Sequence, residues 1–420
     1  MVKSHTTSVS GLATFFGVMY LVQSLGDPGS GIIAQPVRSM LKSEGVSADE
    51  IAAFMAIVGL PWAIKPLLGL LSDFVPLFGS RRRNYLILAI LGACLGTAIL
   101  AGMPVLASDR GYLLALLLLS AMGVAFGDVL IDGLMVTEGQ PRGLTGVLQS
   151  VQWTAAYLGL LVTGIAGGYL AQLGRPDLAF ALCACLWGIS LVLAVALVRE
   201  PEVTPAQSLL DLKEMVSQIW AMPGLGAVTL FLLVWNFNPL WTSVLYLHLT
   251  ESLGGSEVDF GEFLSVFSFG AMLGSLTYPL YCTRIRLGYL VQASIVLGIL
   301  GNLVYLWIDA PDSVAAWAIA CTTGMTYMAG TMIHLDIAAR RAPLVAAASV
   351  FALLMALSNL SSSLSEAAGG ALYQYLLPMG TDTAYSAVVI TSAVFPAFCW
   401  LLVPWLRRAV PEWFNREPRI

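Results

Sequence analysis

Residues Ile57 to Asp73 read IVGLPWAIKPLLGLLSD, an apolar run with a lysine near its middle. A run this hydrophobic is untypical of a soluble helix and typical of one that crosses a bilayer core of about 30 Å. A lysine at the centre of such a helix costs about 2.5 to 3.5 kcal/mol on insertion scales, so Lys65 should face a cavity or a partner rather than lipid. The stretch therefore predicts a membrane helix with a charge in its interior.

The rest of the chain has the same character. Of its 420 residues, 58% are hydrophobic and 11% are charged, whereas a soluble domain carries about 25% charged residues. Apolar stretches of spanning length recur from end to end and leave no room for a soluble domain of useful size. The sequence predicts an all-α membrane protein of twelve transmembrane helices, near residues 11–37, 50–73, 85–107, 111–136, 144–172, 177–198, 224–250, 258–282, 288–308, 313–338, 343–377 and 384–406. No small-residue cleavage site follows the first span, so we expect a retained helix rather than a signal peptide.

Lysine and arginine are distributed unequally between the two predicted sides of the membrane. With both termini placed in the cytoplasm, fifteen of the 20 Lys and Arg residues lie in cytoplasmic segments, four lie outside and Lys65 lies within a span. Because cytoplasmic loops are rich in these residues, the bias predicts that both termini are cytoplasmic. The net charge of −5 gives no indication of nucleic-acid binding.

Two short matches indicate an internal repeat. PLFGSRRR at Pro76–Arg83 resembles PLYCTRIR at Pro279–Arg286, 203 residues further on, and AGGYL at Ala166–Leu170 matches AGGAL at Ala368–Leu372, 202 residues further on. Each repeat holds six spans, an even number, so the halves share one topology and are related by an axis along the membrane normal. Two parallel six-helix repeats are the arrangement of the major facilitator fold, in which substrate is held between the halves. The predicted domains are residues 1–198 and 223–420, with a cytoplasmic linker at 199–222.

Helix depth indicates a partner for Lys65. Asp73 marks the cytoplasmic end of the second span, eight residues and about 12 Å from Lys65. The fourth span ends near Val136, so Asp128 lies at the same level, and we expect the two side chains to meet. Asp132 lies one turn nearer the cytoplasm on the same face. A substrate or coupling role and a purely structural ion pair both remain open for Lys65 and Asp128.

Other polar residues within the spans are candidates for the same site. The first span contains GDPGSG at Gly26–Gly31, where Pro28 removes a helical hydrogen bond, so we expect a kink and backbone groups that a ligand can reach. The seventh span carries aromatic and amide side chains beside Pro239. Interhelical hydrogen bonds explain the glutamines equally well, and helix packing explains the tryptophan. The predicted substrate-binding or coupling residues are Lys65, Asp128, Asp27, Gln149, Gln152, Trp235, Asn236, Asn238 and Glu366.

The loop after the second span is expected to close the cytoplasmic end. In GLLSDFVPLFGSRRR at Gly69–Arg83, Asp73 can pair with Arg81 or Arg83, while the arginines also fix the topology. Acidic and histidine side chains near the same surface are expected to join this closure. The predicted cytoplasmic gate consists of Asp73, Arg81, Arg83, Asp132, His334 and Asp336.

No metal site, cofactor or enzyme activity is predicted. The six cysteines fall in or at the ends of apolar spans, and the nearest pair, Cys183 and Cys185, forms only a C-x-C. The sequence lacks the H-E-x-x-H and G-x-S-x-G patterns of common hydrolases.

Several motifs of the N-terminal half resemble one family. PWAIKPLLGLLSD at Pro61–Asp73 and VPLFGSRRRNYLIL at Val75–Leu88 resemble the second helix and following loop of the folate-biopterin transporters, a branch of the major facilitator superfamily. GDVLIDGLMV at Gly127–Val136 is similar to the paired-aspartate fourth helix of that family. WNFNPLWTS at Trp235–Ser243 is a weaker match. The resemblance implies proton-coupled movement of folates or pterins by alternating access.

We therefore expect a secondary active transporter for a small polar or anionic solute, in which Lys65 is the counter-charge to Asp128 and exchanges that partner for substrate or proton during the cycle. The expected partners are this small molecule, the proton and the lipid bilayer, and we expect a monomer in a bacterial inner membrane. Muropeptide and acetyl-coenzyme A carriers of the same superfamily look similar in the arginine loop and the fourth helix, so they remain alternatives. A membrane-embedded binding or assembly factor that does not transport also remains open.

Overall fold

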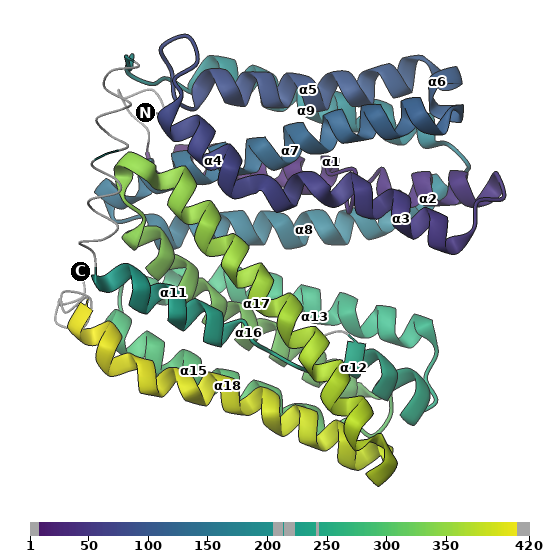
Figure 1. The fold of residues 1–420 in the computed structure, drawn as a ribbon, viewed down its shortest axis with the longest axis vertical. Coiled ribbons are helices and arrows are strands. Elements are labelled where there is room, and N and C mark those ends of the chain that lie inside the picture. Colours follow the sequence, from purple (N-terminus) through teal and green to yellow (C-terminus); the bar gives the residue numbers. More distant parts are fainter. Residues whose placement is uncertain (1–7, 205–212, 214–222, 241–242, 410–420) are drawn as a thin grey trace. The chain divides into compact units, whose positions relative to one another are not determined.

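The computed structural model describes residues 8–204, 213, 223–240 and 243–409, and this part of the chain is almost entirely helical. Within it, ten helices are long and apolar enough to cross a membrane, by length and composition. The chain divides into two compact units, here called the N-terminal unit (Met1–Gln218 with Ala342–Leu353) and the C-terminal unit (Ile219–Arg341 with Leu354–Ile420). In Figure 1 the helices within each unit lie side by side.

The N-terminal unit contains the helices of the first six predicted spans. Proline opens α6 and α9, at a position where its missing N–H group leaves no helical hydrogen bond unmade. Asp109 begins α7 by accepting hydrogen bonds from the free N–H groups of Gly111 and Tyr112. The elements are α1 (Val9–Gly26), α2 (Ala34–Ser43), α3 (Ala48–Gly59), the 3-10 segment η1 (Leu60–Ile64), α4 (Lys65–Phe74), α5 (Arg83–Gly102), α6 (Pro104–Ser108), α7 (Arg110–Gly139), η2 (Gln140–Arg142), α8 (Thr145–Gln172), α9 (Pro176–Leu197) and η5 (Leu344–Ala346).

The C-terminal unit contains the helices of the other six spans. One helix, α17 (Ala347–Leu376), belongs to both units, because its first seven residues fall in the N-terminal unit. The other elements are α11 (Pro223–Trp235), α12 (Ser243–Leu247), the π-helical η3 (His248–Ser252), α13 (Glu257–Thr277), α14 (Pro279–Cys282), α15 (Leu287–Leu303), η4 (Val304–Trp307), α16 (Val314–Arg341), η6 (Leu377–Met379) and α18 (Thr381–Ala409).

The first helix of each repeat is interrupted at an acid or amide followed by proline. In the N-terminal unit, α1 ends at Gly26, just before Asp27 and Pro28, and helix resumes at Ala34. In the C-terminal unit, α11 ends at Trp235, just before the segment Asn236–Pro239. Proline cannot donate to the helical ladder, so the chain leaves the helix at both places. The expected kink is therefore a full break.

Equivalent helices have equivalent neighbours in the two units. In the N-terminal unit α5 packs against α7 and α9, and in the C-terminal unit α15 packs against α16 and α18. Within the second unit α13 and α16 approach until their backbones touch, since a Cβ at Gly270 would lie 2.0 Å from the Cys321 carbonyl oxygen and one at Gly324 would lie 2.1 Å from that of Phe267. Small residues at such seams are the usual device for close helix packing in membranes.

Most of the predicted linker at 199–222 lies outside the described residues. The predicted cytoplasmic linker and the domain boundaries therefore stay predictions.

Candidate functional site

Lys65 stands where the second span changes its helical form. Pro61 and Pro66 each remove a backbone donor, and the five residues between α3 and α4 form a 3-10 segment. Lys65 is the first residue of α4. The single helix expected from the apolar pattern is thus three pieces, and the lysine lies at the junction of two of them.

The Lys65 ammonium forms an ion pair with Asp128 on α7, the partner expected from helix depth. The two side chains are 13% and 10% exposed, so the pair is largely withdrawn from water. The ammonium also lies 4.9 Å from the centroid of the Trp62 ring, within the range of a cation–π contact. Each buried charge depends on the other, because removal of one leaves its partner uncompensated.

Asp132 lies one turn along α7 from Asp128 and is buried. One of its oxygens accepts a hydrogen bond from the Tyr20 hydroxyl at 2.6 Å and another from Gln152 Nε2 at 3.0 Å. These partners belong to α1 and α8, and neither is an arginine of the loop, so the place of Asp132 in the cytoplasmic gate stays a prediction. We call Lys65, Asp128, Asp132, Tyr20 and Gln152 the Lys65 cluster.

The polar groups at the break after α1 form hydrogen bonds with one another. Asp27 is buried, and its Oδ2 accepts hydrogen bonds from the backbone N–H and the hydroxyl of Ser30, at 3.1 and 2.6 Å. The N–H groups of Gly31 and Ile32 donate to the carbonyls of Asp27 and Leu25. Three donors of GDPGSG are therefore occupied within the chain, which leaves less backbone for a ligand than the sequence predicted.

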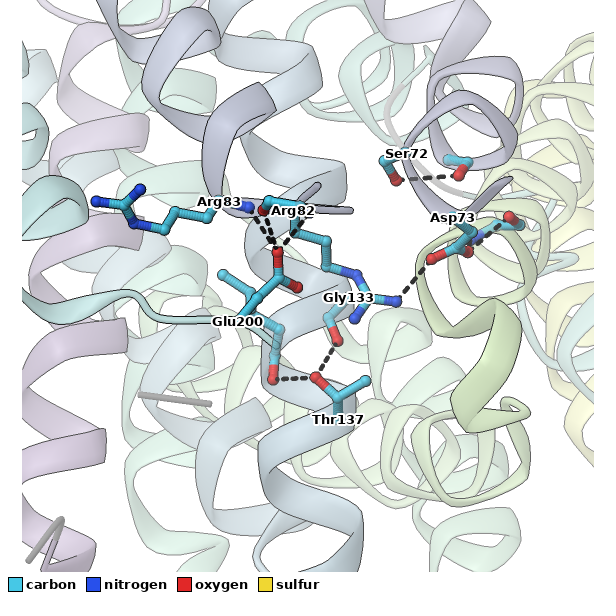
Figure 2. A network of polar contacts seen from close by, with 11 residues as sticks. Ser72, Asp73, Arg82, Arg83, Gly133, Thr137 and Glu200 are labelled. Carbon is cyan, nitrogen blue, oxygen red and sulfur yellow. Dashed lines mark hydrogen bonds and ion pairs between the residues drawn. The ribbon is translucent and has the colours of Figure 1, made fainter. Parts of the chain in front are cut away.

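Asp73 joins the arginine loop to the start of α17, as Figure 2 shows. The carboxylate is fully buried. Its Oδ1 accepts a hydrogen bond from Arg82 at 2.6 Å, and its Oδ2 accepts two from Ser349, from the backbone N–H at 2.8 Å and from the hydroxyl at 2.7 Å. Because N–H groups in the first turn of a helix lack helical partners, Asp73 acts as a cap supplied from elsewhere in the chain. Room for this contact comes from Gly69, where a Cβ would lie 2.8 Å from Ser349 Cα.

The arginine that Asp73 binds is Arg82, not Arg81 or Arg83 as predicted. The chain reverses in a tight turn between Leu77 and Ser80, in which Phe78 and Gly79 both have positive φ, 48° and 77°. This turn decides which of three adjacent arginines faces back towards α4, and the sequence pattern alone does not.

Glu200 holds the other side of the loop. Its Oε2 accepts hydrogen bonds from the Ser80 hydroxyl at 2.7 Å and from the backbone N–H groups of Arg82 and Arg83, at 2.7 and 2.8 Å (Figure 2). Arg83 in turn donates from Nε to the Val198 carbonyl at 2.8 Å. The chain just after α9 is thus fastened to the loop before α5.

The Glu200 carboxyl group has a lowered pKa. Burial raises the pKa of Glu200, but the Arg82 charge and the hydrogen bonds from the loop outweigh the effect of burial. The pKa therefore lies below its ordinary value of 4.5. A carboxylate of this kind stabilises the fold above its unfolded-state pKa, and the contribution is lost as the pH falls through the lower, folded-state value.

We expect Glu200→Gln to lower the thermal unfolding midpoint at pH 7, because the amide cannot accept three hydrogen bonds as a charged group does. The difference from wild type should shrink once the pH falls below 4.5. Thermal unfolding of both proteins in detergent across this pH range measures it. A difference that stays constant with pH would show that the Glu200 charge contributes nothing.

In the C-terminal unit, the contacts at the end of α16 differ from those of Asp73 and Glu200. Asp336 is fully buried and binds Arg340 through two hydrogen bonds, at 2.9 and 2.5 Å, while the Tyr278 hydroxyl donates to it at 3.1 Å. His334 lies within hydrogen-bond distance of the Ser294 hydroxyl, at 3.2 Å, and its ring is 4.1 Å from that of Trp235. Asp336 is therefore paired within its own helix, and His334 belongs to an aromatic setting rather than to an ion pair.

The remaining candidates are spread over both units. Trp235, Asn236 and Asn238 line a cavity of about 140 Å³ in the C-terminal unit. Gln149 on α8 is fully buried, and neither polar atom of its amide has a partner among the residues that the structure describes. Glu366 is half-buried on α17 and has an interaction partner. The structure thus joins Lys65, Asp128 and Gln152 in one cluster and places the seventh-span residues in another.

Residues of these networks that the sequence patterns do not single out include Tyr20, Arg82, Glu200 and Ser349. Tyr20 and Ser349 carry no local signal, because serines and tyrosines are common in membrane helices. Arg82 belongs to the arginine motif, but the pattern does not distinguish it from its two neighbours. Glu200 stands between Arg199 and Pro201 in the predicted linker, where a single acidic residue is expected to be exposed to solvent. Within the described ranges no group of three or more His, Cys, Asp or Glu side chains is placed to hold a metal ion.

Comparison with known proteins connects this geometry to a family. The BT1 family matches residues 29–410. A folate-biopterin transporter of Synechocystis sp. is 29% identical over 398 residues, which cover 89% of this chain and 77% of the relative. Probable folate-biopterin transporter 4 of Arabidopsis thaliana is 32% identical over 164 residues, covering 38% of this chain and 33% of the relative.

The fold also matches solved structures. The human organic anion transporter MFSD10 (TETRAN) aligns over 93% of this chain and 98% of its own, with a TM-score of 0.68 and 14% identity. At that identity the likeness establishes the fold, which is the predicted major facilitator fold with two parallel six-helix repeats. The chain therefore belongs to the BT1 family of folate-biopterin transporters and is a membrane transporter, not an enzyme.

Proposed function

We propose that the protein is a secondary active transporter that moves a folate- or pterin-like solute by alternating access, coupled to protons. The family and the names of its relatives support the solute class. The Lys65 cluster is the observation that carries the coupling. Charged residues inside a membrane are costly, and they usually mark a pathway for substrate or protons.

The charge of the cluster does not balance. It contains two carboxylates, Asp128 and Asp132, and one ammonium, Lys65. Asp132 is 2% exposed, and its partners Tyr20 and Gln152 are neutral donors. The nearby guanidinium of Arg82 already binds Asp73. A buried, uncompensated carboxylate is strongly disfavoured, and binding one proton removes the excess charge.

Asp132 is therefore the proton site in this proposal, and Lys65 with Asp128 is the substrate-responsive pair. A proton on Asp132 leaves Lys65 and Asp128 both ionised, so the ammonium can turn from Asp128 to an anionic solute. When Asp132 loses the proton, it regains its negative charge one helical turn from Asp128. The two carboxylates then attract the Lys65 ammonium and hold it within the cluster. A ligand or proton that prefers one arrangement shifts the balance between the facing states by that preference.

The cytoplasmic gate in this proposal is centred on Asp73, Arg82 and Ser349, with Arg81 and Arg83 in the same loop; Asp336 with Arg340 is a separate candidate at the end of α16 in the C-terminal unit. Because Asp73 caps α17 directly, opening this end would separate the carboxylate from Ser349. The excess of Lys and Arg in the predicted cytoplasmic segments and the cyanobacterial relative support a bacterial inner membrane with both termini inside.

The proposal predicts a separation of exchange from coupling in Asp132→Asn. The amide keeps the hydrogen bonds of the site but cannot bind and release a proton, so accumulation driven by a pH gradient should fall at least tenfold while counterflow exchange persists. Uptake of labelled pterin or folate into vesicles, with and without the gradient, measures both activities. Asp312→Asn, at an exposed position of the loop before α16, is the matched control.

Two results would count against the proposal in different ways. Full gradient-driven accumulation by Asp132→Asn would remove that residue as the proton site. Wild-type vesicles that show neither uptake nor counterflow of any pterin or folate would overturn the proposed function itself and favour a binding protein that uses the transporter fold.

A further inference from the structure

The cavity in the C-terminal unit has walls without charge. It is lined from the break after α11 and from α13, α15, α16, α17 and α18, and its lining contains no Asp, Glu, Lys, Arg or His side chain. An ionised group placed there would lose its hydration without gaining a counter-ion. The cavity is thus unsuited to a carboxylate or an ammonium.

Several polar groups in these walls already donate a hydrogen bond within their own unit. The amide nitrogens of Asn236 and Asn302 donate to the carbonyls of Leu232 and Gly298, at 2.9 and 2.8 Å. The hydroxyls of the lining also donate to carbonyls of their own helices. Such bonds are made by Thr323, Thr326, Ser365 and Ser392.

The amide oxygens of Asn236 and Asn302 remain available, whereas Ser392 Oγ already accepts a hydrogen bond from the Leu240 N–H at 2.8 Å. Neither Asn236 Oδ1 nor Asn302 Oδ1 accepts a hydrogen bond from any residue that the structure describes. A hydroxyl that has donated its proton offers only lone pairs, so the polar wall is rich in acceptors. Donors lie among them as well: Nε1 of Trp235, a side chain 7% exposed, is buried without a partner in the described part of the chain. The amides of Asn236, Asn238 and Asn302 also keep N–H groups that make no hydrogen bond with any described residue.

Aromatic faces complete the cavity. Trp235, Phe237, Phe267 and Tyr327 all contribute to its lining. Flat rings bury large apolar areas and stack favourably against other rings. A ligand that fits has a planar, uncharged ring with N–H donors along its edge.

We propose that this cavity binds the uncharged pterin-like ring of the solute and reads its N–H groups through Asn236 and Asn302, while anionic parts of the solute are bound elsewhere. The inference rests on the proposed function and adds that the ring and the anionic parts of the solute are bound by different groups. The ring is recognised by neutral acceptors in one unit, and the charged cluster of Lys65 lies in the other unit.

Purified protein and four probes test this division. The probes are pterin, folate, 1,3-dimethyllumazine, in which both pyrimidine nitrogens are methylated and a carbonyl replaces the amino group of pterin, and p-aminobenzoylglutamate, the charged fragment of folate without the ring. Ligand-induced thermal stabilisation gives the affinity of each probe. We expect pterin to bind, dimethyllumazine to bind at least tenfold more weakly, and Asn302→Leu and Asn236→Leu each to weaken pterin binding about tenfold, since each leaves a ring donor unpaired. Asn359→Leu, at an exposed amide of α17 outside the cavity, should bind as wild type does.

A steric variant guards against misfolding of the asparagine variants. Gly301 lines the cavity, and a Cβ there would be 3.4 Å from the nearest atom, Thr326 Oγ1, so the wall tolerates it. Gly301→Leu should abolish pterin binding, whereas Gly261→Leu, where a Cβ meets no atom within 4 Å, should not.

Three outcomes decide the matter. Weaker pterin binding in all three cavity variants, with normal binding in the controls, supports the proposal. Wild-type affinity for pterin in folded Asn302→Leu and Gly301→Leu, or equal affinity for pterin and dimethyllumazine, overturns the cavity as the ring site while leaving transport intact. A wild-type protein that neither binds nor transports pterin and folate overturns the proposed function on which the inference rests.

Discussion

Lys65→Ala is expected to reduce gradient-driven uptake of pterin or folate about 100-fold or more. The change leaves Asp128 buried without its ammonium, and breaking a buried ion pair by removing one partner costs about 3 to 5 kcal/mol. Asp128 can avoid this cost only by taking up a proton, so a group that should respond to substrate becomes neutral. Asp128→Asn should impair uptake comparably, because it leaves the lysine uncompensated. Vesicle uptake and thermal unfolding midpoints, measured together, separate loss of function from loss of fold.

The double variant makes this test sharper. Lys65→Ala with Asp128→Asn removes both charges, so we expect its unfolding midpoint to recover towards wild type while its uptake stays low. Lys42→Ala, at an exposed position near the end of α2, should change neither quantity. Unchanged uptake in Lys65→Ala and in Asp128→Asn would exclude the pair from the transport mechanism.

Asp73→Ala should be among the most destabilising substitutions in the chain. It removes the carboxylate that binds Arg82, whose side chain is 6% exposed, and it leaves the Ser349 N–H and hydroxyl without their acceptor. We expect a loss of about 3 to 5 kcal/mol, the usual cost of leaving one buried charge without its partner. Thermal unfolding in detergent measures the loss, and hydrogen exchange at residues 347–353 should accelerate with it.

A comparison of two capping aspartates isolates the effect. Asp109 also accepts N–H bonds at the start of a helix, at 2.8 and 3.1 Å, but at an exposed site. Asp109→Ala should therefore cost only about 1 kcal/mol. Arg82→Gln combined with Asp73→Asn should cost less than the two single changes together, because neither charge is then left alone. Equal effects of Asp73→Ala and Asp109→Ala would refute the special role of the buried contact.

The sequence predicts this fold well because the position of a membrane helix depends on the length and polarity of its segment more than on its contacts with other helices. Each of the twelve predicted spans contains helix in the described residues, and the pairing of Lys65 with Asp128 followed from counting residues along two helices. Depth is a one-dimensional quantity, so a single sequence can supply it.

Lateral contacts need information that the pattern of apolar residues does not contain. Asp73 and Ser349 are 276 residues apart, and nothing local to either one indicates the other. The choice of Arg82 among three arginines depends on the turn at Leu77–Ser80, and the placement of Asp132 depends on which face of α7 meets α1 and α8. These are questions of rotation about helix axes, which hydrophobicity leaves weakly determined in a helix buried on several sides.

Because α17 begins in one unit and continues into the other, a small rotation at its first residues moves its last residues over a much larger distance. The helix is continuous from Ala347 to Leu376, so its 30 residues extend about 45 Å. A tilt of roughly ten degrees about the end held by Asp73 would carry the far end through about 8 Å, given that length. The making or breaking of two hydrogen bonds between Asp73 and Ser349 would thereby accompany a displacement of the far end several times longer than a hydrogen bond.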